Sequence, residues 1–198
     1  MTQGFAKSLS EVRRLQIELA RSRPYRDAGL VGNPSAREAD LVAVERRLGL
    51  QLPPSYRAFL LTHDGWPRFF AGASLLGTRS LGQASHAELV TTLLGSANPY
   101  GARAGVGAGP CPPSRRPLPF GIDPAGTTLF AFDLSRRRAD GECEVVAWLN
   151  EVGVRRPDFT SFLGLIAELC QAEIDDERGA AREVQSTQRG PFYEARVA

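Results

Sequence analysis

Five acidic residues form the group in this chain best placed for joint chemistry. Asp123, Asp133, Asp140, Glu142 and Glu144 lie close together in the sequence, around two predicted strands. Carboxylates grouped in this way could act as a general acid–base pair or bind a divalent cation. Their positions beside turns favour a structural role instead, because such side chains accept hydrogen bonds from turn amides. An enzyme or small-molecule site that uses Asp123 and Asp133 remains an alternative.

Other residue types give no pattern of a catalytic site. The two histidines, His63 and His86, belong to no HExxH helix, and His63 falls where it can cap the end of a predicted helix. The glycine run at 105–109 lacks the lysine of a phosphate-binding loop, and no serine lies in a GxSxG turn. We therefore expect no catalytic residue, no bound cofactor and no metal ligands.

The spacing of the cysteines and the net charge indicate the redox environment of the protein and the kinds of partner that it can attract. Cys111, Cys143 and Cys170 match neither a CxxC redox pair nor a zinc site, so we expect reduced thiols in a cytoplasmic protein. The N-terminal residues lack the apolar core of a signal peptide, and no segment approaches a membrane span. With a formal net charge of +2, the chain has no general attraction for nucleic acid.

Two short helices are predicted between Ser35 and Gly65. Ser35 and Glu38 have the spacing of a capping box, and Gly49 is a typical helix end. Pro53 and Pro54 then predict the start of a second helix that ends at Gly65. The apolar residues repeat at helical spacing, which indicates that both helices pack on a core. These apolar residues are Leu41, Val44 and Leu48 in the first helix and Tyr56, Phe59 and Leu60 in the second.

The remaining chain predicts helices at both ends and strands between them. A further helix is expected at 86–94, a long Gly/Pro-rich loop at 95–119, and one or two short strands after Trp66. Alternating apolar residues predict strands at 127–133 and 143–149, joined by a polar turn in which Arg136 to Arg138 are solvated. The first and last helices are expected at 5–23 and 160–175, the latter capped by Thr160 or Ser161.

Three segments, in the right order, resemble the SUKH superfamily, which contains the yeast Smi/Knr cell-wall regulator domain and many bacterial immunity proteins. The first is VERRLGLQLPPSYRAFLLTHDG, similar to the family pattern of Glu, Leu-Gly, Leu-Pro, Tyr, Phe-Leu and Gly. The second is LPFGIDPAGTTLFAFDL, with its Pro-Phe, Asp, Gly and strand that ends in Asp. The third is the strand around Trp148 followed by SFLGLIAEL. Together they span about residues 35–173, and their matching residues mainly specify the fold.

The resemblance implies a single α+β domain with a twisted, mostly antiparallel sheet and helices packed against it. The domain itself would cover 35–175, after an N-terminal helical extension and connector at 1–34 and before a polar C-terminal tail at 176–198. It also implies a non-catalytic protein that binds other proteins, in bacteria typically an immunity protein against a toxin encoded nearby, often a nuclease. A general scaffold or regulator without a toxin partner is the alternative.

A tight protein interface needs aromatic or arginine anchors inside a polar rim. The candidate anchors lie after the second predicted helix and in the Gly/Pro-rich loop. They are Trp66, Phe69, Phe70, Tyr100, Arg103, Arg115 and Arg116. Each could instead be core or solvated loop, and burial is the favoured interpretation of Trp66 and Phe69. Self-association is left open.

Overall fold

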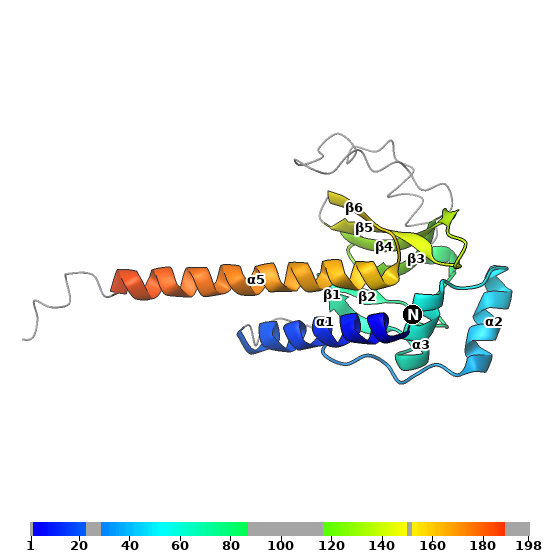
Figure 1. Cartoon of the computed structure of the whole chain (residues 1–198), viewed down its shortest axis with the longest axis horizontal. Coiled ribbons are helices and arrows are strands. Elements are labelled where there is room, and N and C mark those ends of the chain that lie inside the picture. Colours follow the sequence, from blue (N-terminus) through cyan, green and yellow to red (C-terminus); the bar gives the residue numbers. More distant parts are fainter. Residues whose placement is uncertain (1, 23–28, 87–116, 150–151, 189–198) are drawn as a thin grey trace, which may run out of the picture.

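The computed structural model describes residues 2–22, 29–86, 117–149 and 152–188 (Figure 1). Within these residues, six strands form one antiparallel sheet whose spatial order follows the sequence. The strands are β1 (Trp66–Phe70), β2 (Ala73–Leu75), β3 (Pro117–Ile122), β4 (Thr128–Arg137), β5 (Cys143–Leu149) and β6 (Val152–Arg156). The helices are α1 (Thr2–Ser22), α2 (Glu38–Leu48), α3 (Pro54–Thr62) and α5 (Phe159–Gln188). The α+β class with an antiparallel sheet is confirmed.

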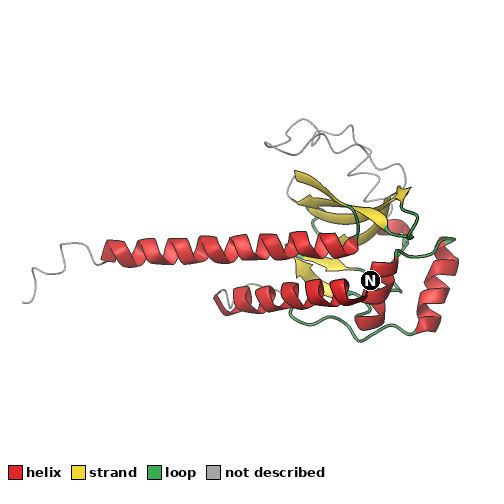
Figure 2. Ribbon diagram, in the orientation of Figure 1, coloured by secondary structure: helices red, strands yellow, loops and turns green. Residues whose placement is uncertain are grey.

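One face of the sheet carries α1, α3 and α5, and α2 lies beside α3 (Figures 1 and 2). An aromatic cluster joins these layers. The ring of Tyr56 on α3 contacts Phe120 and Phe132 on the sheet at 5.2 Å and Phe159 on α5 at 5.0 Å. Edge-to-face and tilted contacts of this kind stabilise aromatic pairs beyond simple burial. The core therefore sits between the sheet and the three helices.

Helices α1 and α5 run side by side in the same direction (Figure 1). The ring of Phe5 stacks on Phe159 where both helices begin, at 6.4 Å between centroids. Near the other end of α1, Glu18 accepts a hydrogen bond from Arg178 at 2.6 Å. The apolar side of α1 is buried in the same core as the sheet, through Phe5, Leu9, Val12, Leu15 and Leu19. The predicted N-terminal helix is confirmed, and it contributes directly to the core.

The helix caps differ from those predicted. Ser35 does not cap α2, because Ala36 N donates to the carbonyl of Leu60 at 2.9 Å and holds this segment extended. The N-cap is instead Arg37, two residues after Ser35, and its backbone N donates to the Asp40 carboxylate at 3.2 Å. Similarly, Asp158 caps α5 by accepting from Ser161 N at 2.8 Å. The predicted C-cap at Gly49 is confirmed, with φ of +64°.

The segment from α3 to β2 shows why its glycines are needed. Helix α3 ends at Thr62, three residues before the predicted end at Gly65. Gly65 instead forms the turn into β1 with φ of +86°, and a Cβ there would lie 2.8 Å from both Gly77 N and Leu75 O. Ala71 and Gly72 both have positive φ, as a tight β-hairpin turn requires, so β1 and β2 form the expected pair of short strands.

Other predicted boundaries need correction. Strand β3 begins at Pro117, so the predicted loop ends earlier than Pro119; residues 87–116 lie outside the described part, and with them most of the predicted helix at 86–94. Strand β4 continues past Asp133 to Arg137, and β6 was not predicted. Helix α5 extends to Gln188, into the residues expected to form a polar tail. No helix among the described residues has both the length and the apolar character needed to cross a bilayer.

Candidate functional site

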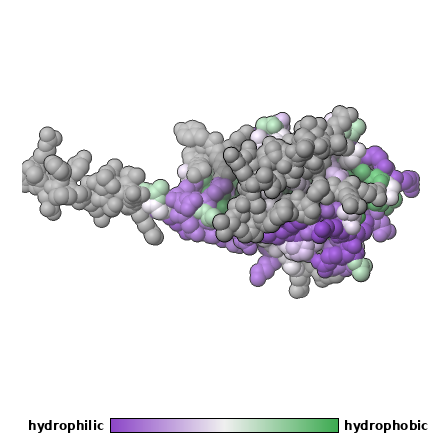
Figure 3. All heavy atoms as spheres, turned by 90° about the horizontal axis from the view of Figure 1, so that it is seen from above, coloured by the Kyte–Doolittle hydropathy of each residue, from purple (hydrophilic) through white to green (hydrophobic). Residues whose placement is uncertain are grey.

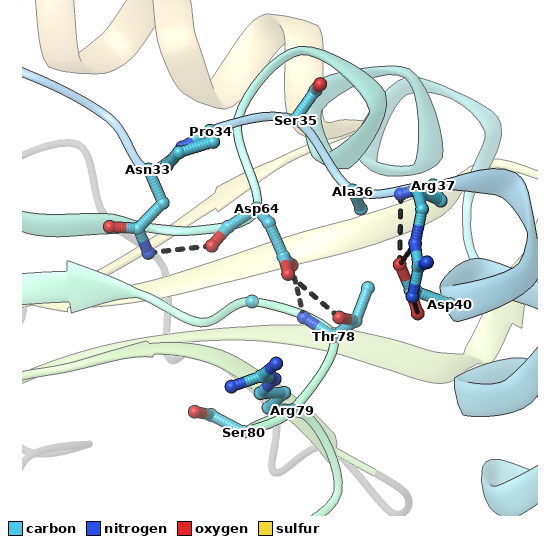
Figure 4. Close-up of a pocket in the computed structure, with 11 residues that line it drawn as sticks. Asn33, Pro34, Ser35, Ala36, Arg37, Asp40, Asp64, Thr78, Arg79 and Ser80 are labelled. Carbon is cyan, nitrogen blue, oxygen red and sulfur yellow. Dashed lines mark hydrogen bonds and ion pairs between the residues drawn. The ribbon is translucent and has the colours of Figure 1, made fainter.

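A polar pocket of about 560 Å³ lies between the segment before α2 and the loop after β2 (Figure 4). Asn33 to Arg37 form one wall, and Thr78, Arg79 and Ser80 form the opposite wall, with Asp64 between them. The two walls come from parts of the chain about 40 residues apart, so only the folded structure brings them together. We take this pocket as the candidate functional site.

Backbone hydrogen bonds fix the first wall. Asn33 N donates to the carbonyl of Gly65 at 3.0 Å, and the Asn33 amide group donates to the carbonyl of Asp64 at 2.8 Å. The bond from Ala36 N to Leu60 O completes this attachment to the end of α3. His63 also contacts this segment, since its Nδ1 lies 3.1 Å from the carbonyl of Asn33. His63 is the C-cap residue of α3, as expected, but it caps through its backbone N, which donates to the carbonyl of Phe59 at 2.7 Å.

The opposite wall is held by Asp64 and Arg47. The Asp64 carboxylate accepts from Thr78 N at 2.5 Å and from the Thr78 hydroxyl at 2.9 Å. A Cβ at Gly77 would lie only 2.7 Å from Asp64 Oδ1, so this approach requires glycine. From the other side, Arg47 donates to the carbonyls of Thr78 and Leu81, each at 2.8 Å. The loop therefore has a fixed conformation.

Two arginines supply the positive charge of the pocket. Arg37 pairs with Asp40 at 3.0 Å, and its side chain is 83% exposed. The hydrogen bonds from Arg37 are the main cause that lowers the pKa of Asp40, and the positive charge of Arg79 contributes to the same shift. The Arg79 side chain is exposed, and it forms no ion pair within the part of the chain that the structure describes.

A second, smaller pocket of about 350 Å³ lies where α1, α3 and α5 begin. Its acids cap helices or form an ion pair with Arg138. The buried Glu142 carboxylate accepts from Ser55 N and from the Ser55 hydroxyl, both at 2.7 Å, at the start of α3. Arg138 bridges Asp140 at 2.7 Å and Asp158 at 3.4 Å. This pocket is therefore a structural junction between helix ends.

The structure places the three aromatic candidate anchors in the core. Trp66, Phe69 and Phe70 are 1%, 2% and 8% exposed, and the Trp66 indole donates to the carbonyl of Gly29 at 2.6 Å. Trp66 and Phe69 are therefore buried, as favoured from the sequence, and Phe70 belongs to the same core. The other candidates, Tyr100, Arg103, Arg115 and Arg116, lie outside the described residues.

The acids around β3 to β5 serve turns and ion pairs, as favoured from the sequence. Asp123 accepts from Thr128 N at 2.7 Å, and Asp133 accepts from Ser135 N at 3.1 Å and lies 3.2 Å from Arg155. Asp123 and Asp133 are separated by the length of β4 from Thr128 to Asp133, roughly 16 Å at the ~3.3 Å rise of a strand. The described residues contain no cluster of His, Cys, Asp or Glu suited to a metal ion.

The prediction that the arginines between β4 and β5 are solvated is only partly correct. Arg136, Arg137 and Arg138 are exposed but each has a partner. Arg136 lies 3.4 Å from Glu144, and Arg137 donates to the carbonyl of Gln51 at 2.9 Å. The long strand β4 brings these side chains back toward α3, which the sequence pattern did not show. Cys143 and Cys170 are buried, and neither forms a disulfide within the described part of the chain.

The fold and the pocket define an α+β protein that carries a polar, preformed surface site on a helix-covered antiparallel sheet. The model of the SMI1 / KNR4 family (SUKH-1) matches residues 35–167, and the chain belongs to this family. The resemblance to the SUKH superfamily is thereby confirmed. A search of curated proteins gave no match to the chain.

Proposed function

We propose that this chain is a non-catalytic immunity protein that binds and neutralises a cognate bacterial toxin, often of the nuclease type. The observation that carries the proposal is membership of the SMI1 / KNR4 family (SUKH-1) over most of the chain, since this family is generally one of immunity-type, protein-binding domains. The proposed site of action is the cytoplasm, where such a toxin would otherwise act.

The use of polar groups in the structure supports a binding role. The carboxylates that could have formed a reaction centre are engaged in turns, caps and ion pairs, and Asp123 and Asp133 are separated by the stretch of β4 from Thr128 to Asp133. The polar pocket is fixed by hydrogen bonds on both walls, which reduces the conformational entropy lost when a partner docks. No specific observation favours a small-molecule or enzymatic site at Asp123 and Asp133.

The proposal is tested with the toxin domain encoded beside this gene. Co-expression of the chain should restore growth to cells that produce the toxin, and the two purified proteins should form a 1:1 complex in size-exclusion chromatography at micromolar concentration. The Leu41→Asp variant, whose core is disrupted, is the control. It should not restore growth if rescue requires the folded protein. Failure of both rescue and complex formation would contradict the immunity role and favour a scaffold or regulator without a toxin partner.

A further inference from the structure

Arg79 lies on the wall of the polar pocket, and its guanidinium forms no ion pair with any other residue that the structure describes. It lies beside Ser80 across from the segment that runs from Asn33 to Arg37 (Figure 4). Arg47, on the far side of the same loop, uses its guanidinium for backbone carbonyls. Arg37 is already paired with Asp40. Among the arginines that line the pocket, Arg79 is therefore the one available to an incoming acceptor.

The charge of the pocket sets the kind of acceptor. The lining residues include two arginines, Arg37 and Arg79, and two carboxylates, Asp40 and Asp64. Either kind of anion could pair with Arg79. The two carboxylates of the pocket would repel a doubly charged phosphate more strongly than a ligand with a single negative charge. Guanidinium groups match carboxylates in a planar, two-point geometry. The balance of charge thus favours a carboxylate.

The loop that carries Arg79 is held in place before any ligand arrives. Thr78 is bound on one side by Asp64 and on the other by Arg47. His86 Nδ1 lies 3.2 Å from the carbonyl of Ser80, which fixes the next part of the loop. Because the backbone on each side of Arg79 is fixed, only the side chain has to be ordered on binding, and the entropy cost stays small.

We propose that this pocket binds a Glu or Asp side chain of the partner protein, with Arg79 donating both hydrogen bonds to the carboxylate. The partner would present this acid on a protruding segment that enters between Asn33–Arg37 and Thr78–Ser80. This inference rests on the proposed function in one respect, that the carboxylate belongs to a protein partner. Whether the pocket binds a carboxylate at all is tested separately.

The pocket chemistry is tested with N-acetylglutamate α-amide, which offers one side-chain carboxylate. In ¹⁵N NMR titrations of the full chain, the amides of Thr78, Arg79 and Ser80 should shift to saturation with a millimolar dissociation constant. Arg79→Gln should weaken this binding by about tenfold or more, as loss of a charge-assisted pair predicts. Arg13→Gln, which removes an exposed arginine on α1, is the matched control and should bind normally.

Five results decide the inference. Shifts that do not saturate, or that are equal in Arg79→Gln, overturn it, and so does tighter binding of inorganic phosphate than of the glutamate probe. If Arg79→Gln still binds and neutralises the toxin as well as the natural chain does, the inference is overturned while the proposed function stands. If the probe binds in an Arg79-dependent way but no toxin complex forms, the proposed function fails and the carboxylate chemistry of the pocket is supported.

Discussion

Tyr56 shows how one polar atom is accommodated in an aromatic core. Its hydroxyl donates to the carbonyl of Leu76 at 2.5 Å, and burial is the main cause that raises the pKa of this phenol well above 10.0. The carbonyl of Leu76 follows β2, so the hydrogen bond ties α3 to the sheet. A buried hydroxyl without such an acceptor would cost free energy.

Tyr56→Phe should lower the free energy of unfolding by about 1–2 kcal/mol at pH 8, because a buried hydrogen bond is lost. The raised pKa keeps folded Tyr56 protonated, whereas the unfolded chain loses this proton above about pH 10. This contribution is therefore complete below pH 10 and declines as the pH rises above it. Urea unfolding at pH 8 and pH 10.5 should show a smaller difference between the two proteins at the higher pH. A difference that grows with pH would contradict this.

Glu142 is the second residue whose role can be measured alone. Its buried carboxylate receives two hydrogen bonds from Ser55 at the start of α3. Glu142→Gln should reduce the free energy of unfolding by about 1–3 kcal/mol, because an amide replaces the charged acceptor. The control is Glu168→Gln, whose side chain is 73% exposed and should change stability by less than about 0.5 kcal/mol. Equal effects in chemical denaturation would show that Glu142 has no capping role.

At the scale of elements, two glycines make a matched pair. Gly65 has φ of +86° and no room for a Cβ, whereas a Cβ on Gly164 in α5 would meet nothing within 4 Å. Gly65→Ala should destabilise the protein by about 1–3 kcal/mol through backbone strain. Gly164→Ala should stabilise it by roughly 0.5–1 kcal/mol, because alanine favours the helix. Thermal unfolding followed by circular dichroism gives both signs, and a melting temperature raised by Gly65→Ala would disprove the account of this turn.

The sequence pattern located the helices and strands better than their ends. The apolar residues were sufficient to predict five elements, because their spacing reflects which face of each element is buried. These elements are α1, α2, α3, β4 and β5. The cap of α2 was misplaced because its position depends on the hydrogen bond from Ala36 to Leu60, a tertiary contact. Strand β6 was missed because its residues, VGVRR, show no clear alternation of apolar and polar side chains.

The candidate site could not be predicted from sequence patterns, because it too depends on tertiary contacts. Asp64, Thr78 and Arg79 belong to no sequence motif. They line a pocket only because the chain folds them against the segment that precedes α2. Trp66, Phe69 and Phe70, the aromatic candidates on β1, are core residues. Large apolar side chains are a poor guide to a binding surface when the core needs them. Only an exposed arginine between small residues could have pointed to the site.

At the scale of the whole molecule, the helices and the sheet share one core. The described surface seen from above is mostly hydrophilic, with small hydrophobic areas (Figure 3). Leu15 on α1 is 2% exposed and belongs to the same cluster as residues of α5 and the sheet. The packing therefore indicates that these elements lose their structure together.

Leu15→Ala should lower the free energy of unfolding by about 2–5 kcal/mol, because it leaves a cavity in the shared core. Far-ultraviolet circular dichroism and tryptophan fluorescence should give one coincident transition in both the natural chain and the variant. Lys7→Ala, at an exposed position on the same helix, is the control and should leave the transition nearly unchanged. Early loss of helix signal, before the fluorescence change, would show that α1 unfolds independently of the sheet.

Helix α5 continues to Gln188, whereas its neighbour α1 ends at Ser22, close to the contact between Glu18 and Arg178. The first half of α5 rests on aromatic and aliphatic side chains, and its last turns extend beyond α1 (Figure 1). Helical turns without tertiary support are only marginally stable in water. Backbone amide protons in α5 should therefore exchange with deuterium slowly near Phe162 and progressively faster toward Gln188, a gradient built into a single continuous helix.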